Sequence, residues 1–269
     1  MKDIYGGKKI LITGASSGIG FEFAKILDKY DCTLILVARR REALDKVKFT
    51  LSSDGLAKIF CFNVDLSRPE ELEVFYNNLE EKELIPDILI NNAGRQDYGY
   101  FHKLRWRDEY EQVALNCIAP MYLVYKIVPS MIKNNFGKIL NVGSVAGTMP
   151  GPFFATYAAT KAFINSFSQS ISGEINNRNI QCSCLLPGTT NTNNFWNVPI
   201  LKEKVGDISR FASAHNVARY GLRLLEQNKS YGVYGLKNKI TQFIKRFTPL
   251  GLLNLALKKH NYSSLLDQI

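Results

Sequence analysis

The sequence lacks the long apolar run of a membrane-spanning protein, and its first residues are not those we expect of a secretory leader. No apolar stretch reaches the roughly 18 residues that a membrane-spanning helix requires. The chain passes directly from Met1 into an apolar run that begins at Lys9, with no small-residue cleavage site between them. We therefore expect a cytoplasmic protein.

Cysteine is scarce, and its spacing does not suit a metal. The five cysteines are odd in number. Cys182 and Cys184 would point to the same face of a strand, but they lack the two-residue spacer of a metal clip and have no histidine nearby. We interpret the cysteines as reduced core thiols and predict no bound metal.

Acidic residues are nearly missing from the C-terminal part of the chain. The net charge is +10, and residues 227–269 hold seven basic residues against one acidic residue, Asp267. A nucleic-acid-binding protein would need a basic face with base-reading or stacking groups on a recognisable module. The sequence shows no such module, so we predict no nucleic-acid partner.

The residues that are present predict a single large α/β fold. A hydrophobic fraction of 46% favours a sizeable core over disorder. Short apolar runs suited to buried strands alternate with helical segments, at 9–13, 32–38, 58–64, 87–90, 137–142 and 180–186. This alternation predicts a Rossmann-type, doubly wound parallel sheet with helices on both faces, and such sheets bind ligands at the carboxyl ends of their strands.

A glycine-rich turn follows the first predicted strand. Residues 13–20 read TGASSGIG and lead into a helix with apolar residues at helical spacing. Glycines let the backbone approach a pyrophosphate, and the helix N-terminus offers free N–H groups and the positive end of a dipole. Strand, turn and helix together favour a dinucleotide site over a plain connecting turn.

The second predicted strand ends without the acidic residue that selects NAD. Ala38 occupies the expected position, and Arg39, Arg40 and Arg41 follow. A guanidinium pairs well with a phosphate, so we predict NADP(H), with Arg39 and Arg40 on the 2′-phosphate. The alternative, a solvated charge run that opens the next helix, fits Arg41 better than Arg39.

Other strand ends supply further candidates for the dinucleotide site. Asp65 could accept a hydrogen bond from the adenine amino group, or it could serve as a turn or helix-cap residue. The small residues of Asn91-Asn92-Ala93-Gly94 would let the backbone lie against the cofactor.

Tyr157 and Lys161 lie four residues apart in a predicted helix. Residues at this spacing project from the same helical face. A nearby ammonium favours the phenolate and lowers the pKa of a tyrosine, which makes the phenol a usable general acid or base. Asn116 lies inside a predicted helix at 106–131, where asparagine indicates a side-chain role or a polar contact between helices.

These motifs resemble the short-chain dehydrogenase/reductase family, in its NADP-preferring form. The likeness rests on TGASSGIG, NNAG, Ser144, YAATK and PGTTNT, in this order, and it covers about residues 5–235. It implies a catalytic domain at 1–235 and a helical C-terminal extension at 236–269 that is packed on it or projects from it.

The resemblance also implies catalytic roles. Tyr157 transfers the proton to or from the substrate oxygen, and Ser144 hydrogen-bonds that oxygen. Lys161 lowers the pKa of Tyr157 and binds the nicotinamide ribose, while Asn116 holds a water of a proton path. The implied cofactor contacts, beyond Tyr157 and Lys161, are Gly14, Ser16, Ser17, Gly18, Ile19, Gly20, Arg39, Arg40, Asp65, Leu66, Asn92, Ala93, Gly94, Pro187, Gly188, Thr190 and Thr192.

The segments that would shape the substrate side are aromatic and aliphatic. They contain Ala146 and Phe154 near Ser144, and Phe195 and Trp196 in a lid at about 189–212. They favour a bulky hydrophobic substrate, and a hydroxysteroid fits best, unless these aromatics only pack the lid against the core. A 3-oxoacyl reductase of lipid synthesis and a non-catalytic NADPH sensor are the alternatives.

The C-terminal extension contains an amphipathic pattern. Ile240, Phe243, Ile244 and Phe247 follow helical spacing, and a second leucine-rich stretch ends at Lys258 and Lys259. This pattern could pack on its own domain, cover the substrate pocket, lie on a membrane surface or form a dimer contact. The family resemblance implies a dimer or tetramer formed through the helices at 106–131 and 157–175.

Overall fold

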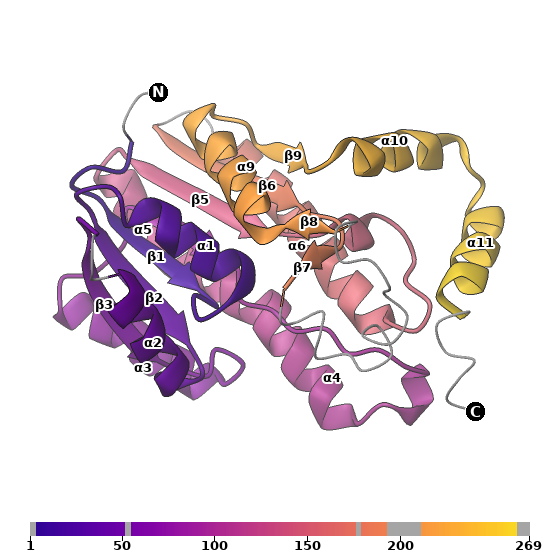
Figure 1. The fold of residues 1–269 in the computed structure, drawn as a ribbon, viewed down its shortest axis with the longest axis horizontal. Coiled ribbons are helices and arrows are strands. Elements are labelled where there is room, and N and C mark those ends of the chain that lie inside the picture. The colour runs from indigo at the N-terminus through magenta and orange to yellow at the C-terminus, as the bar shows by residue number, and fades with distance from the viewer. Residues whose placement is uncertain (1–3, 52–54, 176–178, 193–210, 263–269) are drawn as a thin grey trace.

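The computed structural model describes residues 4–51, 55–175, 179–192 and 211–262, and it shows a seven-stranded sheet in the order β3-β2-β1-β4-β5-β6-β9 (Figure 1). Every neighbouring pair is parallel. The strands are β1 (Lys9–Thr13), β2 (Thr33–Ala38), β3 (Lys58–Asn63), β4 (Ile88–Asn91), β5 (Gly137–Val142), β6 (Ile180–Leu186) and β9 (Tyr231–Val233). The prediction of a Rossmann-type α/β fold is confirmed.

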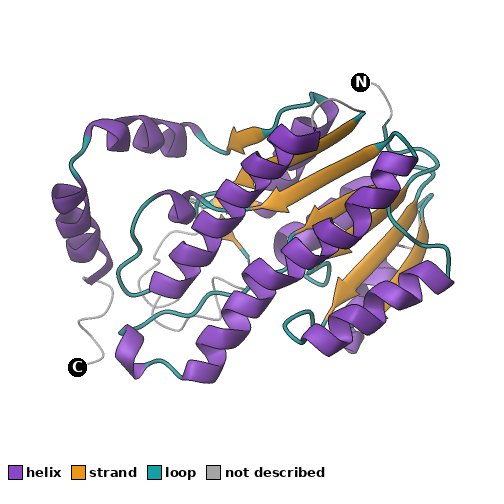
Figure 2. Ribbon diagram, turned by 180° about the vertical axis from the view of Figure 1, so that it is seen from behind, coloured by secondary structure: helices purple, strands orange, loops and turns teal. Residues whose placement is uncertain are grey.

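Helices cover both faces of this sheet (Figures 1 and 2). Their bounds are α1 (Gly18–Leu27), α2 (Arg41–Leu51), α3 (Pro69–Glu81), α4 (Trp106–Val113), α5 (Ala119–Lys133), α6 (Ala155–Ile175) and α9 (Ala214–Glu226). Side chains alternate between the two faces along a strand, so successive residues pack into the two hydrophobic cores on opposite faces of the sheet. Leu34 and Leu36 pack with α1, α2 and α9, while Ile35 and Val37 pack with α3, α5 and α6.

Full burial on two faces explains why the strands are continuous apolar runs. The predicted strands match the observed ones within one or two residues, but β9 and a small parallel pair were not predicted. That pair joins β7 (Thr190–Asn191) to β8 (Ala212–Ser213).

All five cysteines are free, and only Cys61 is not fully buried, which confirms the interpretation as reduced core thiols.

The predicted helix at 106–131 is one helical stretch, Trp106–Lys133, with a π-helical turn (η2, Ala114–Ile118) between α4 and α5. Among the described residues it alone is long and apolar enough to cross a membrane by length and composition, and 44% of its most apolar window is buried. Leu123 and Ile127 are buried against the sheet, which is the packing of a core helix.

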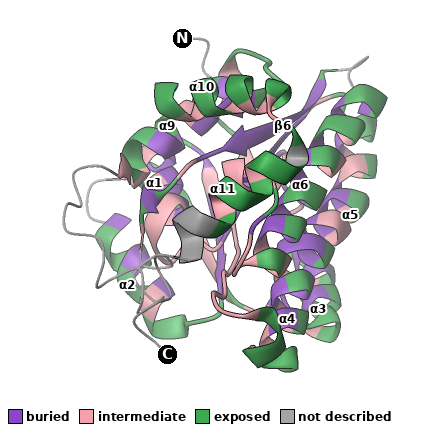
Figure 3. Cartoon of the chain, turned by 90° about the vertical axis from the view of Figure 1, so that its right-hand side faces the viewer, coloured by how far each residue is buried: buried purple, intermediate pink, exposed green. Residues whose placement is uncertain are grey.

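The C-terminal extension is helical and leaves the body of the protein after β9 (Figures 1 and 2). It consists of α10 (Leu236–Ile244), a 3₁₀ turn η5 (Lys245–Phe247) and α11 (Leu250–Tyr262). Two further 3₁₀ turns are η1 (Phe101–Lys103) and η3 (Val145–Thr148). The extension is largely exposed, as Figure 3 shows for α10 and α11.

Candidate active site

The glycine turn between β1 and α1 has the conformation that a pyrophosphate requires. Gly14 and Gly18 have φ values of +66° and +57°, which only glycine adopts without strain. A Cβ atom on Gly14 would lie 2.8 Å from Cα of Ala93. Helix α1 begins at Gly18, Ser17 makes no side-chain capping bond, and the first turn holds no acidic residue. Its N–H groups and dipole therefore suit an anion.

Asn92 secures this turn from the neighbouring strand. Its side-chain amide donates to the carbonyl oxygens of Thr13 (3.0 Å) and Gly14 (3.3 Å). The hydroxyl of Thr13 accepts in return from the backbone N–H groups of Asn92 and Ala93, both at 3.0 Å. The small residues after β4 thus fix the shape of the glycine turn, a link that the sequence motif alone did not reveal.

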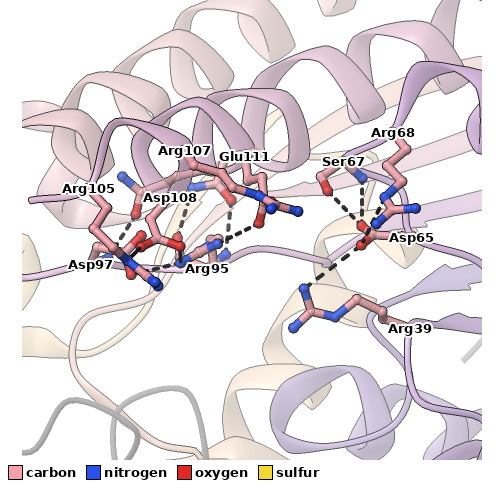
Figure 4. A network of polar contacts seen from close by, with 12 residues as sticks. Arg39, Asp65, Ser67, Arg68, Arg95, Asp97, Arg105, Arg107, Asp108 and Glu111 are labelled. Carbon is pink, nitrogen blue, oxygen red and sulfur yellow. Dashed lines mark hydrogen bonds and ion pairs between the residues drawn. The ribbon is translucent and has the colours of Figure 1, made fainter.

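Arg39 and Asp65 lie beside each other at the ends of β2 and β3 (Figure 4). The Nη1 atom of Arg39 is 3.9 Å from Oδ2 of Asp65, and the arginine side chain is 67% exposed. Oδ1 of Asp65 accepts from the N–H (3.1 Å) and hydroxyl (2.6 Å) of Ser67, so this carboxylate is a turn residue ahead of α3. Arg40 is exposed, and the side chain of Leu66 is buried in the core.

The four predicted catalytic residues come from three elements. Ser144 follows β5 and caps η3, where its Oγ accepts from the N–H of Ala146 at 3.1 Å. Tyr157 and Lys161 lie one turn apart on α6. The Nζ atom of Lys161 donates to the carbonyl of Val142 at 2.8 Å and lies 5.8 Å from the centre of the Tyr157 ring.

The pKa values of this pair differ from the expectation. Burial raises the pKa of Tyr157, and its hydrogen bond with Ser144 only partly opposes that effect. Burial also lowers the pKa of Lys161 to about 8. Desolvation dominates for both groups, so the pKa of Tyr157 is raised rather than lowered here, and the role of Lys161 toward Tyr157 stays a prediction. The hydrogen bond with Ser144 is the interaction that favours the tyrosinate.

Asn116 projects from the π-helical turn, and it is 2% exposed. Its Oδ1 accepts from the N–H of Arg95, and its Nδ2 donates to the carbonyl of Arg95 and to Oγ1 of Thr160, each at 3.0 Å. A Cβ atom on Gly94 would lie 3.2 Å from Oδ1 of Asn116 and 3.7 Å from Nζ of Lys161. Asn116 and Lys161 thus flank one glycine.

A small cavity lies between Asn116, Lys161 and residues of the sheet. Its volume is about 10 Å³, which is the space that one water needs. Its lining includes Asn91, Asn116, Asn141 and Lys161. Oδ1 of Asn91, one of the lining residues, is buried and accepts no hydrogen bond from the described residues. This geometry suits a polar relay behind Lys161.

The loop after NNAG holds an ion-pair network that the sequence did not indicate (Figure 4). Arg95 pairs with Asp97 (3.0 Å), Asp108 (3.2 Å) and Glu111 (3.0 Å). Burial alone would raise the pKa of Asp108, but its bonds to Arg105 and Arg95 lower it. The network fixes the loop after β4, and the backbone of Arg95 in this loop hydrogen-bonds the side chain of Asn116. The guanidinium of Arg95 has three carboxylate partners.

Aromatic rings gather beside Tyr157. Tyr98 stacks on Phe154 with 6.0 Å between ring centres, and Phe154 meets Tyr157 edge-on at 6.4 Å. Phe153 contacts Tyr98 and Tyr100, and its φ of +72° is a strained conformation for a bulky residue. We call Tyr98, Tyr100, Phe153 and Phe154 the aromatic wall. Phe195 and Trp196, with most of the predicted lid, lie outside the described residues.

The segment after β6 contacts both the turn that Ser144 caps and the glycine turn between β1 and α1. The carbonyl of Pro187 accepts from the N–H of Val145 at 3.0 Å, which ties this segment to the turn that Ser144 caps. The hydroxyl of Thr190 donates to the carbonyl of Gly188 at 2.9 Å. Thr192 lies against Gly18, since a Cβ there would come within 3.1 Å of its side chain. Thr192 and Asn92 thus both contact the glycine turn.

The fold is a Rossmann-type sheet, and Ser144, Tyr157 and Lys161 lie together near the end of β5. The chain belongs to the short-chain dehydrogenase family, whose model matches residues 8–200. The prediction of the family and of the enzyme class is confirmed.

Comparison with individual proteins agrees with this assignment. The chain is 34% identical over 178 residues to a very-long-chain 3-oxoacyl-CoA reductase of Coprinopsis cinerea, a match that covers 64% of this chain and only 52% of that relative. A short-chain dehydrogenase from Sphingobium yanoikuyae in complex with NADPH is similar in structure, with a TM-score of 0.78, 29% identity and coverage of 84% of this chain and 87% of that one. The bulky-bulky ketone specific alcohol dehydrogenase from Comamonas testosteroni has a TM-score of 0.76 and 26% identity, with coverage of 89% and 93%.

Proposed function

We propose that the protein is an NADP(H)-dependent oxidoreductase that interconverts a secondary alcohol and a ketone on a bulky hydrophobic substrate. The observation that carries this proposal is the surroundings of Tyr157. Its hydroxyl is hydrogen-bonded to Ser144, and its ring adjoins the aromatic wall. A substrate oxygen placed at the tyrosine would therefore have its carbon skeleton against apolar rings.

The NADP(H) preference is supported by the end of β2. Among the described residues, the exposed guanidinium of Arg39 has only a long ion pair to Asp65, so it can pair with a phosphate. The NADPH complex of the Sphingobium yanoikuyae dehydrogenase agrees with this preference. The open glycine turn and the uncapped start of α1 suit the pyrophosphate that either nicotinamide dinucleotide carries.

Bound NADPH would supply the hydride, and the chain supplies the proton and the orientation. Tyr157 donates its proton to the oxygen that becomes an alcohol, and its raised pKa keeps the phenol protonated for this step. Ser144 donates a hydrogen bond to the same oxygen as negative charge develops there. Lys161, Asn116 and the cavity between them can return a proton to the tyrosine.

A hydroxysteroid is the substrate class that we favour. The aromatic wall offers flat apolar surfaces, and the nearby cation Arg95 is held by three carboxylates, so it is not available to a substrate carboxylate. A sugar or a short keto acid would place its polar groups beside these apolar rings without hydrogen-bond partners. The Comamonas testosteroni enzyme, by its name specific for bulky-bulky ketones, supports a wide hydrophobic pocket.

A 3-oxoacyl thioester is the second candidate. Its specific support is the 34% identity to the fungal very-long-chain 3-oxoacyl-CoA reductase. An acyl chain would also lie against aromatic rings. The two candidates differ in the rest of the substrate, because a thioester carries phosphates on its carrier group whereas a steroid is a rigid ring system without phosphates.

We also propose a homo-oligomer formed through α4, α5 and α6. These helices expose large apolar side chains, among them Trp106 and Tyr125, each 75% exposed, and Phe163 at 39%. Single exposed apolar residues are ordinary, but several on adjacent helices favour a contact between copies.

The test is NADPH consumption against oxo-steroids, 3-oxoacyl thioesters, and small aldehydes and sugars, with Tyr157→Phe as the blank. We expect turnover of a bulky ketone that is abolished in the variant while NADPH binding is retained. Phe154→Ala should weaken turnover of bulky ketones more than that of small ones. Turnover of thioesters alone would assign the second candidate. Tight NADPH binding with no turnover of any substrate would favour a sensor, and equal activity of Tyr157→Phe would refute the mechanism.

A further inference from the structure

Helix α10 presents its apolar side to solvent. Ile240, Phe243, Ile244 and Phe247 follow the spacing of one helical face, and they are 49%, 62%, 57% and 75% exposed. The rings of Phe243 and Phe247 contact each other edge-on, with 5.4 Å between their centres. The apolar face of α10 and η5 is therefore in water.

The opposite side of the helix is polar, and it faces the protein. Gln242 donates to Oγ1 of Thr148 at 2.7 Å, and Nζ of Lys245 donates to the carbonyl of Thr148 at 2.6 Å. Asn238 lies against Gly188, where an added Cβ would come within 2.8 Å of its Oδ1. A surface helix normally buries its apolar stripe and hydrates its polar one. In α10 the polar side faces the protein and the apolar side faces solvent, so packing on this domain does not explain the apolar face.

Basic side chains flank the apolar face on both edges. On a helix of 3.6 residues per turn, Lys237 lies at one edge of the stripe, and Lys239 and Arg246 lie at the other. No carboxylate among the described residues pairs with Lys237, Lys239, Lys245 or Arg246. Figure 3 shows the exposed course of the extension, which continues through α11.

A cationic hollow lies beneath this face. Its volume is about 360 Å³, and its lining includes Lys239, Lys245, Arg246 and Tyr231. Burial and then the nearby charge of Arg246 lower the pKa of Lys245. An anionic group in the hollow would relieve their repulsion.

We propose that α10 and η5 form a docking surface for an anionic lipid bilayer. Ile240, Phe243, Ile244 and Phe247 enter the boundary between headgroups and acyl chains, and the flanking basic residues meet the lipid phosphates. Charge favours this occupant over a second copy of the same face. Two such faces would bring like charges together, and neither copy has carboxylates on α10 to offset them.

The experiment is sedimentation of the full chain with vesicles of phosphatidylcholine alone, or of phosphatidylcholine with phosphatidylglycerol. We expect binding to the anionic vesicles, weak binding to the neutral ones, and loss of binding at high salt. Phe243→Ser with Phe247→Ser should weaken binding at least about tenfold. Lys239→Gln with Arg246→Gln should weaken it by about the same factor, on anionic vesicles only.

Matched controls lie on α2, far from the extension in sequence. Phe49 is 84% exposed, and Lys46 is exposed, so Phe49→Ser and Lys46→Gln should leave vesicle binding unchanged. NADPH binding and circular dichroism confirm that each variant folds, and the assay does not depend on the substrate. No binding to anionic vesicles at low salt would overturn the proposal. A fall in oligomeric state caused by Phe243→Ser with Phe247→Ser would overturn it as well, and would assign the face to a second copy.

Discussion

The side-chain amide of Asn165 spans the backbone of Ser144. Its Nδ2 donates to the carbonyl of Ser144 at 3.0 Å, and its Oδ1 accepts from the N–H of Ser144 at 3.4 Å. Asn165 lies one turn after Lys161 on α6 and is 5% exposed. The helix that carries the tyrosine and the lysine therefore also positions the serine.

Replacement of Asn165 should disturb catalysis through Ser144. Asn165→Leu leaves the N–H of Ser144 without its partner and its carbonyl with only the N–H of Gly147, so we expect a loss of about 1–3 kcal/mol in the free energy of unfolding. We also expect kcat to fall while KM and NADPH affinity change little, since the serine acts mainly on developing charge. Chemical denaturation and steady-state kinetics measure both effects. Ser170→Ala, on an exposed part of the same helix, is the control, and an unchanged kcat in Asn165→Leu would show that Ser144 needs no such support.

The stability of the protein should depend on pH through Lys161. In the folded state this lysine loses its proton near pH 8, whereas its ordinary pKa is 10.5. Above pH 8 the unfolded chain therefore binds more protons, so stability rises with pH by up to about 1.4 kcal/mol per pH unit. Lys161→Met should lack this rise.

The difference in unfolding free energy between the wild type and Lys161→Met is clearest between pH 8 and 9. The buried thiols of Cys117 and Cys184 have pKa values raised to about 11 from 9.0, so above pH 9 they oppose the lysine. Urea denaturation at several pH values gives the difference in unfolding free energy between wild type and Lys161→Met. A difference that stays constant from pH 7 to pH 9 would contradict the lowered pKa of Lys161.

Cofactor choice should change with Arg39. Arg39→Ala removes a charged hydrogen-bond donor to the 2′-phosphate, so NADPH should bind about tenfold to a hundredfold more weakly and NADH should be unaffected. Fluorescence titration with both cofactors measures the two affinities. Arg41→Ala is the matched control, because Arg41 is 83% exposed and pairs with Asp45. An equal loss for NADPH and NADH would exclude the 2′-phosphate assignment.

Two glycines should respond to alanine in opposite directions. A Cβ on Gly147 would overlap the backbone of Lys161 and Ala162, so Gly147→Ala should separate η3 from α6 and cost about 1–3 kcal/mol in stability, with reduced kcat. Gly173 lies inside α6 with nothing near its missing Cβ, so Gly173→Ala should add about 0.5–1 kcal/mol. Thermal unfolding distinguishes the two, and a neutral Gly147→Ala would show that η3 can shift freely.

Much of the fold could be predicted from the sequence because its signals are local. A buried parallel strand needs a run of apolar residues, and β1, β5 and β6 were placed at their observed bounds for that reason. The glycine turn was predictable in the same way, since two of its residues need positive φ. Short strands such as β9 carry no comparable pattern.

Features that depend on distant contacts could not be predicted. Lys161 was expected to act on Tyr157 because four-residue spacing shows proximity, but spacing does not show burial, which controls both pKa values. The spacing of Phe243 and Phe247 predicted an amphipathic helix without showing which side faces the protein. The partners of Arg95 were hidden because its carboxylates come from a loop and another helix.

The π-helical turn at Asn116 means that the helical stretch Trp106–Lys133 contains one residue more than a regular α-helix would fit into the same rise. Deleting a single residue there would restore the ordinary hydrogen-bond ladder. Because the π-helical turn absorbs the extra residue locally, α4 and α5 would keep their faces, and the change would fall on the residues of the turn itself. An apparently conservative shortening of this helix would therefore separate the Asn116 amide from Arg95 and Thr160, so chain length at this point is as strongly constrained as residue identity.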